Sequence, residues 1–265
     1  MRLAFITPTA FVEKFGSQGD FTLALSHLMD LKEVNEYEKA ITKVGPPILC
    51  DNGLFENHVP ESLETLIKKA ERIGATHFFA PDILYSSEGT QLELDKAILA
   101  AEKSPVKVAA VVQASNVQDY MSQLLDFNNN PKVDLIGLSI LSIPKSFREV
   151  TGTDDISTNR IALLKSMKKM ADGGVKWKNC HMLGLGNDYA DVIFATKYCP
   201  YVVSNDTSSA MWNGYQGKRI EGDKLEVEGG KTKVSVDFDC KDICEEQISL
   251  IQRNINQVKK VIKNL

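Results

Sequence analysis

The sequence predicts an α/β fold, a (β/α)8 TIM barrel with an appended C-terminal β-hairpin and helix. Eight short apolar runs recur along the chain, and helical patterns lie between many of them. Most runs are continuously apolar rather than alternating, which is typical of parallel strands that helices cover on both faces. At 265 residues with 43% hydrophobic content, the chain can bury one large core. We therefore expect a single domain over residues 1–265.

The predicted strands and helices alternate as a parallel barrel requires. The clearest connecting helix lies at residues 60–74, where Pro60 precedes an apolar face at helical spacing and Gly74 ends it. Similar helical patterns occupy residues 87–103, 116–127, 157–171 and 188–198. The eight strands are expected at residues 2–8, 21–28, 46–53, 76–82, 106–113, 133–140, 180–186 and 201–206.

The pattern changes after the eighth strand, so the barrel core is expected to span residues 1–220. Residues 224–238 alternate around Gly229 and Gly230, which predicts an antiparallel hairpin. Apolar side chains then recur every three or four positions from 248 to 265, which predicts an amphipathic helix. We expect this helix to pack on the barrel; an oligomer contact, as in a homodimer, is the alternative.

Composition restricts the partner and the compartment. The net charge of −4 and the pI near 5.7 give no overall nucleic-acid signature, so a polyanion would have to be bound by a local basic patch. Five cysteines without paired metal spacing favour a reducing cytosol. The N-terminal apolar run of four residues is far shorter than a signal peptide or a membrane span. These features predict a soluble cytoplasmic protein with no membrane partner.

Four of the predicted strands end in a carboxylate or an amide: Asp51, Asp82, Gln113 and Asp206. The carboxyl ends of strands in a parallel barrel share one face, where active sites are built. An aspartate at such a position can instead cap the next helix or turn. Together, these four side chains would suit a pocket that hydrogen-bonds a planar heterocycle, or a nucleophile with an acid/base partner.

Other candidates have weaker signals. Gly53, Gly137, Gly184 and Gly186 near strand ends would allow a flat ligand to approach the backbone, whereas a phosphate site is disfavoured because no GxGxxG or Walker pattern occurs. Phe55 is either a stacking platform for a base or a core aromatic. The four histidines are scattered and Cys240 and Cys244 offer only two thiols, so we expect no metal and no cofactor.

These motifs resemble those of the tRNA-guanine transglycosylases (queuine and archaeosine tRNA-ribosyltransferases), which are (β/α)8 barrels that exchange guanine for a 7-deazaguanine. The stretch CDNGLFEN resembles the family's Asp-Ser-Gly-Gly-Phe-Gln segment, which implies that Asp51 is the general acid/base and Phe55 the base-stacking aromatic. The stretch VVSNDTSSA falls where the family has its Phe-Asp-Cys motif, which implies that Asp206 is the covalent nucleophile.

Three further stretches resemble the same family, in its order along the chain. FAPDIL is similar to the family's Phe-Asp-Glu stretch and AVVQAS to its Val-Gln-Gly-Gly, which implies that Asp82 and Gln113 read the base. LIGLSILS resembles Gly-Gly-Leu-Ala-Val-Gly-Glu, which implies backbone contacts from Gly137 and Leu138. HMLGLG resembles Tyr-Leu-Met-Gly-Val-Gly, which implies that Leu183 lies under the base.

The chain also departs from the family. The zinc subdomain that follows the eighth strand in the family is missing, and the shorter chain is more like the compact phage relatives that put 7-deazaguanines into DNA. A phage-encoded protein would act in the host cytoplasm. Ser142 stands where the family has a glutamate, so we expect a neutral nitrile-bearing base to be preferred over the cationic aminomethyl form.

The resemblance implies a transglycosylase that exchanges guanine in nucleic acid, with DNA favoured, for a 7-deazaguanine base through a covalent aspartyl intermediate. Lys218 and Arg219, with Lys231 and Lys233, are the candidate phosphate contacts; solvated surface charge is the alternative for each. The same exchange on tRNA, a non-catalytic binding subunit, and a barrel acting on sugars or phosphates remain as alternatives.

Overall fold

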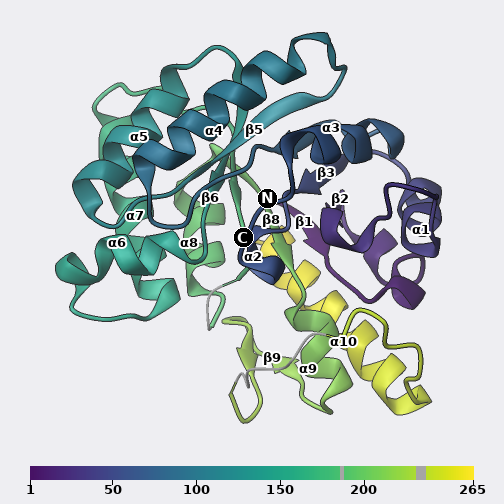
Figure 1. The fold of residues 1–265 in the computed structure, drawn as a ribbon. Coiled ribbons are helices and arrows are strands. Elements are labelled where there is room, and N and C mark those ends of the chain that lie inside the picture. The colour runs from purple at the N-terminus through teal and green to yellow at the C-terminus, as the bar shows by residue number, and fades with distance from the viewer. Residues whose placement is uncertain (186–187, 231–236) are drawn as a thin grey trace.

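In the computed structural model, which describes residues 1–185, 188–230 and 237–265, eight parallel strands form one sheet (Figure 1). All eight predicted strands are confirmed, and the α/β TIM barrel is the fold of this chain. Neighbours in the sheet follow the order β1-β8-β7-β6-β5-β4-β3-β2. The strands are β1 (Arg2–Phe5), β2 (Thr22–Leu25), β3 (Ile48–Asp51), β4 (His77–Phe79), β5 (Lys107–Val112), β6 (Val133–Leu138), β7 (Cys180–Met182) and β8 (Val202–Thr207).

The first and last strands in this order, β1 and β2, approach each other and nearly close the barrel. The Asp20 amide donates to the Leu3 carbonyl at 2.7 Å, and the Leu3 amide donates to Asp20 Oδ2 at 3.0 Å. A Cβ atom on Gly19 would lie 2.8 Å from the Leu3 carbonyl oxygen, so this close approach requires glycine. Asp20 and Gly19 thus join the two strands along a seam.

Helices surround the sheet, with α4 to α8 on one side of the view and α1 on the other (Figure 1). The five predicted connecting helices correspond to α3, α4, α5, α7 and α8. Ser62 caps α3, and Gly74 beyond its end has a positive φ of 65°. The α-helices are α1 (Glu36–Val44), α2 (Leu54–Asn57), α3 (Leu63–Arg72), α4 (Ser87–Ala100), α5 (Val117–Asn129), α6 (Ser142–Thr151), α7 (Ile156–Asp172), α8 (Ala190–Tyr198), α9 (Ser209–Tyr215) and α10 (Glu245–Lys263).

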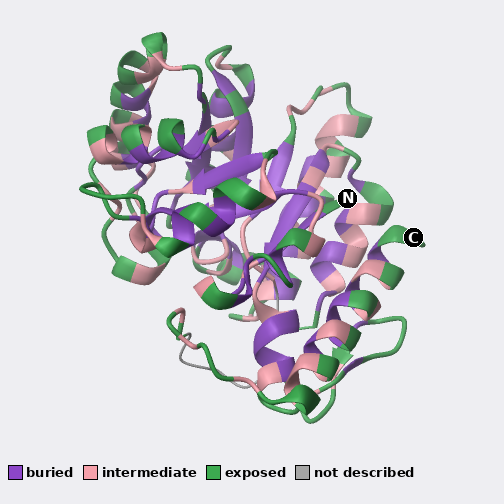
Figure 2. Cartoon of the chain, turned by 90° about the vertical axis from the view of Figure 1, so that its right-hand side faces the viewer, coloured by how far each residue is buried: buried purple, intermediate pink, exposed green. Residues whose placement is uncertain are grey.

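Short 3-10 helices complete the description, at Thr9–Phe11, Gly16–Gln18, Ser26–Leu28 and Ala101–Lys103. The core lies inside the barrel and between the barrel and its helices. Figure 2 shows buried strands in the middle of the molecule and exposed outer faces on the helices. No helix in the described part of the chain is both long and apolar enough to cross a membrane.

The terminal helix α10 packs on the barrel, as predicted. It lies against α9, where Gly214 comes so close that a Cβ atom there would be 2.7 Å from the Ile251 Cα. Its buried face includes Ile251, Ile255, Val258 and Ile262. Near its C-terminus, Lys263 Nζ donates to Asp20 Oδ1 at 2.8 Å. The last helix is therefore tied to the seam between β1 and β2.

The described residues contain a short hairpin that begins before the one predicted at residues 224–238. A two-residue strand, β10 (Glu226–Val227), pairs antiparallel with the preceding β9 (Ile220–Glu221). The chain reverses at residues 222–225 because Gly222 and Leu225 both adopt a positive φ, so the turn precedes Gly229 and Gly230. Most of the second predicted arm, residues 231–236, lies outside the described residues.

Candidate active site

A cavity of about 310 Å³ opens where the carboxyl ends of the strands meet. Its walls are mainly apolar, and its polar side chains include those of Asp51, Asp82, Gln113 and Asp206. The four strand-end residues predicted to converge therefore do so. The other lining residues are Ile6, Leu23, Leu25, Asn52, Leu54, Phe55, Glu56, Leu84, Val111, Ser139, Ile140, Leu141, Leu183, Gly184, Leu185, Thr207, Ser208, Ser209 and Phe238.

Asp206 is a buried carboxylate near the end of β8, with 4% of its surface exposed. One oxygen, Oδ1, accepts hydrogen bonds from the His181 Nε2 and the Gly184 amide, both at 3.0 Å. The other oxygen, Oδ2, accepts no hydrogen bond from the described residues. In the described part of the chain, Asp206 accepts no bond from the turn or helix that follows it, which argues against the capping alternative.

Asp51 ends β3 and accepts a hydrogen bond from the Gly53 amide at 2.8 Å. This bond belongs to the turn that leads into α2, so Asp51 also has the capping role that its residue type favours. Burial raises the pKa of Asp51 to about 6, and the negative charge of Asp206 contributes to the increase. A carboxyl group with this pKa can both give and take a proton near neutral pH.

Asp82 and Gln113 form a buried pair on the cavity floor. Gln113 Nε2 donates to Asp82 Oδ2 at 2.5 Å, and Asn52 Nδ2 donates to Asp82 Oδ1 at 2.6 Å. Ser139 Oγ lies 3.3 Å from the same Gln113 nitrogen. Burial raises the pKa of Asp82 to about 7, although both amide donors oppose the increase. These polar atoms form a hydrogen-bonding edge within an apolar cavity.

Asp82→Asn is expected to change the pH dependence of stability. From about pH 4 to 7 the folded protein holds the Asp82 proton while the unfolded chain has lost it, so wild-type stability falls as pH rises. The amide does not titrate, and the variant should therefore gain stability relative to the wild type across this window. Urea midpoints at pH 4 and 8 measure the difference. Asp126→Asn, at an exposed carboxylate on α5, should show the same change of urea midpoint with pH as the wild type. If Asp82→Asn differed from the wild type by the same amount at both pH values, the raised pKa of Asp82 would be contradicted.

The cavity walls contain two predicted residues, Phe55 and Leu183, and one that was not predicted, Glu56. Phe55 on α2 lines the cavity with 55% of its surface exposed, so it is a rim residue and no core aromatic. Leu183, which follows β7, also lines the cavity. Glu56 also lines the cavity, and its Oε2 lies 3.7 Å from His27 Nδ1. Burial raises the pKa of Glu56 to about 8, with a further contribution from Asp51.

Three residues of the β6 region do not reach the cavity as predicted. Gly137 lies inside the barrel, where a Cβ atom would be 3.0 Å from a Val111 methyl group. Leu138 is buried, and its carbonyl oxygen already accepts from the Leu183 amide at 3.2 Å. Ser142 is fully buried on α6, and its hydroxyl exchanges 2.8 Å bonds with the backbone of Ala114. Ser139, Ile140 and Leu141 line the cavity instead.

The two predicted phosphate contacts that the structure describes, Lys218 and Arg219, are not among the residues that line the cavity. Lys218 Nζ donates to the Gly230 carbonyl at 2.7 Å, and Arg219 lies 3.9 Å from Glu221 in an exposed ion pair. Both side chains are thus engaged within the appended region, while Lys231 and Lys233 lie outside the described residues, as does Gly186. Within residues 1–185, 188–230 and 237–265, no three His, Cys, Asp or Glu side chains cluster as metal ligands would.

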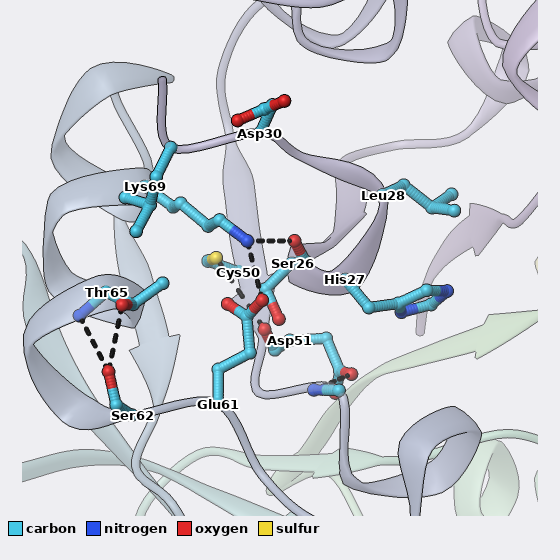
Figure 3. A network of polar contacts seen from close by, with 12 residues as sticks. Ser26, His27, Leu28, Asp30, Cys50, Asp51, Glu61, Ser62, Thr65 and Lys69 are labelled. Carbon is cyan, nitrogen blue, oxygen red and sulfur yellow. Dashed lines mark hydrogen bonds and ion pairs between the residues drawn. The ribbon is translucent and has the colours of Figure 1, made fainter. Parts of the chain in front are cut away.

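A buried ion pair lies behind Asp51 (Figure 3). Lys69 Nζ on α3 donates to Glu61 Oε1 at 2.6 Å and to the Ser26 carbonyl at 2.8 Å. The Glu61 amide in turn donates to the Asn52 carbonyl at 2.9 Å. Lys69 therefore connects the ends of β2 and β3 with the loop that precedes α3, and it supports the turn that carries Asp51.

Lys69→Met is expected to destabilise the protein by about 3–5 kcal/mol, because it leaves the Glu61 carboxylate buried without a partner. The double variant Lys69→Met/Glu61→Gln should recover part of this loss. Lys68 is next to Lys69 in the sequence and forms an exposed ion pair with Glu64. Lys68→Met should lower the free energy of unfolding by no more than about 0.5 kcal/mol. Chemical denaturation compares the three variants; equal effects at positions 68 and 69 would contradict the supporting role.

Besides Glu56, sequence reasoning missed three further groups that shape the site. His181, one of four histidines scattered along the sequence, bonds Asp206. Arg160 on α7 is fully buried, pairs with Asp191 at 3.1 Å and donates to the carbonyl oxygens of Leu183 and Gly184. Asn52 follows Asp51 directly and bonds Asp82. Only Asn52 had a local signal, since a polar residue beside a strand-end carboxylate can share its pocket.

Neither the protein-family models nor the curated proteins with which the chain was compared gave a match.

Proposed function

We propose that this barrel is a guanine transglycosylase that exchanges a guanine of nucleic acid, preferably DNA, for a 7-deazaguanine. The observation that carries the proposal is the placement of two buried carboxylates, Asp206 and Asp51, in one apolar cavity with the Asp82–Gln113 edge. Asp206 has an oxygen without a hydrogen-bond partner among the described residues, as a nucleophile needs. Asp51 has a pKa near 6, as an acid/base group needs.

In the first half of the reaction, the target nucleotide leaves its stack and its base enters the cavity. Asp206 Oδ2 attacks C1′ of the nucleoside, an O–C1′ bond forms and the bond from C1′ to the guanine nitrogen breaks. Asp51 gives its proton to the departing guanine. The polymer is then held as a glycosyl ester of Asp206, and Asp51 is left as a carboxylate.

In the second half, a 7-deazaguanine takes the place of guanine. Asp51 accepts the proton of its ring nitrogen, and that nitrogen attacks C1′ as the ester bond to Asp206 breaks. The carboxylate of Asp206 and the proton on Asp51 are thereby restored, so the exchange needs no redox equivalent and no net hydrolysis.

Asp82 and Gln113 are the groups that recognise the base in this proposal. Guanine and 7-deazaguanines share a pyrimidine edge with N–H donors and a carbonyl acceptor, and a carboxylate with a neighbouring amide is complementary to that edge. Phe55 and Leu183 provide apolar surface for the two faces of the ring. Because Ser142 lies outside the cavity, any preference between nitrile and aminomethyl bases depends on Ser139, Ile140 and Leu141.

Incubation of the purified protein with labelled guanine and either duplex DNA or tRNA tests the proposal. Label in DNA is the expected result. Label in tRNA alone would support base exchange but identify tRNA as the substrate. Label in neither polymer would contradict the proposed reaction. The same assay with a 7-deazaguanine chase should release the label, because the incoming base replaces the guanine.

A further inference from the structure

His181 is a fully buried histidine on β7 with a hydrogen bond at each ring nitrogen. Nε2 lies 3.0 Å from Asp206 Oδ1, and Nδ1 lies 2.9 Å from Ser204 Oγ. A carboxylate only accepts hydrogen bonds, so Nε2 must carry a proton in this contact. In the neutral imidazole, Nδ1 then accepts from the Ser204 hydroxyl, which fixes the tautomer.

The exposure of His181 and Asp206 shows which of the two side chains a ligand can contact. His181 has no exposed surface and Ser204 has 1%, and neither side chain lines the cavity. Asp206 does line it. A ligand in the cavity can therefore touch the carboxylate but cannot touch the imidazole. This excludes the arrangement of a hydrolase triad, in which the carboxylate orients a histidine that meets the substrate.

We infer that His181 is a positioning residue for Asp206, an inference that rests on the proposed function of Asp206 as nucleophile. His181 Nε2 and the Gly184 amide both donate to Oδ1, which fixes the rotation of the carboxylate and leaves Oδ2 as the attacking oxygen. His181 lies on β7, the strand next to β8, and Gly184 lies just beyond the end of β7, so both donors hold the carboxylate against the same side of the barrel.

The two donors are themselves held in place. The imidazole packs edge-on against Phe21, with ring centroids 5.7 Å apart, and in a tilted contact against Phe79, with centroids 5.6 Å apart, and the two contacts restrict rotation of the ring. The Gly184 carbonyl accepts from Asn205 Nδ2 at 2.7 Å and Arg160 Nη1 at 2.9 Å. Gly184 has a positive φ of 65°, a conformation that favours glycine. Each donor therefore meets Asp206 without the reorganisation that a mobile group would require.

Two variants distinguish the hydrogen bond that His181 donates to Asp206 from the space that its side chain fills. His181→Leu fills the space without a donor, and His181→Gln keeps an N–H donor at the reach of Nε2. The single-turnover rate of covalent adduct formation should fall on the order of 10²-fold in His181→Leu and recover at least tenfold in His181→Gln. Affinity for the free 7-deazaguanine should change less than threefold in both. Cys180→Ala, a buried change on the opposite face of β7, is the packing control and should react as the wild type does.

A second measurement does not depend on the reaction. The chain has only four histidines, so ¹⁵N-histidine labelling resolves the His181 ring, and its Nε2 proton should shift in Asp206→Asn while Nδ1 responds to Ser204→Ala. A proton on Nδ1 with Nε2 bare, or wild-type adduct formation in His181→Leu, would overturn the inference. If the wild type formed no adduct while the Nε2 proton still responded to Asp206→Asn, the proposed function would fail and the orienting contact would stand.

Discussion

Asp206→Asn is expected to abolish base exchange, with a loss on the order of 10⁴-fold or more, while leaving the fold intact. The amide keeps the volume of the carboxylate and can still accept from His181 and Gly184 through one oxygen, but it cannot act as an anionic nucleophile. Incorporation of labelled guanine measures the loss, and the thermal unfolding midpoint verifies the fold.

Trapping provides an independent measurement of the same variant. Wild-type protein mixed with nucleic acid should give an adduct that survives denaturation, and Asp206→Asn should give none. A folded Asp206→Asn protein with normal exchange would remove Asp206 from the mechanism and, with it, the proposed reaction path.

Asp51→Asn is expected to reduce turnover by about 10²–10⁴-fold, because the proton relay between the two bases is lost. The amide oxygen can still accept from the Gly53 amide, so the turn into α2 should persist. Adduct formation should also slow, because Asp51 gives its proton to the departing guanine, but Asp206 is still present as the nucleophile and some covalent adduct should remain. The wild-type pH profile should show a limb near pH 6, where Asp51 titrates, and the variant should lack it.

The amount of covalent adduct formed by each variant distinguishes the roles of Asp206 and Asp51. Asp206→Asn should give none, whereas Asp51→Asn should accumulate an adduct that turns over slowly. Equal loss of adduct in both variants, or a limb near pH 6 that persists without Asp51, would contradict the assignment of Asp51 as the acid/base group.

The barrel was predictable because its strands carry a local signal. Runs such as residues 106–113 are apolar without alternation, and this reflects burial on both faces, which is a property of each strand by itself. Short helices lack such a signal. The helices α2 and α9 have four and seven residues, too few for an apolar period to repeat, and α9 is held mainly by its contact with α10.

The positions at the strand ends could be predicted once the strands were known, but the hydrogen-bond partners of their side chains could not. Asp51, Asp82, Gln113 and Asp206 reach one cavity because parallel strands end on one face. The bond between His181 and Asp206 joins residues 25 positions apart and depends on the register of β7 against β8, which sequence spacing does not specify. This is why His181 was assigned to the scattered histidines.

The errors near β6 have a related cause. Motif similarity placed Gly137, Leu138 and Ser142 against a base, but the cavity is lined two to four residues beyond Gly137, at Ser139 to Leu141. Gly137 is required by packing, since it faces Val111, and Ser142 is required by its backbone bonds to Ala114. Small residues satisfy several different constraints, so their identity alone does not distinguish a ligand contact from a core contact.

The contact of Asp20 with both Leu3 and Lys263 determines when the barrel can be completed during synthesis. The seam between β1 and β2 has few backbone bonds, and the helix that braces it from outside is made after all eight strands. A nascent chain can form its strands in order as it emerges, but β1 has no strand to form a ladder with until β8 has left the ribosome, and α10 follows later still. Until then the edges of β1 and β2 are open to pairing with other chains, so chaperone binding to the nascent protein should be concentrated on its N-terminal segment.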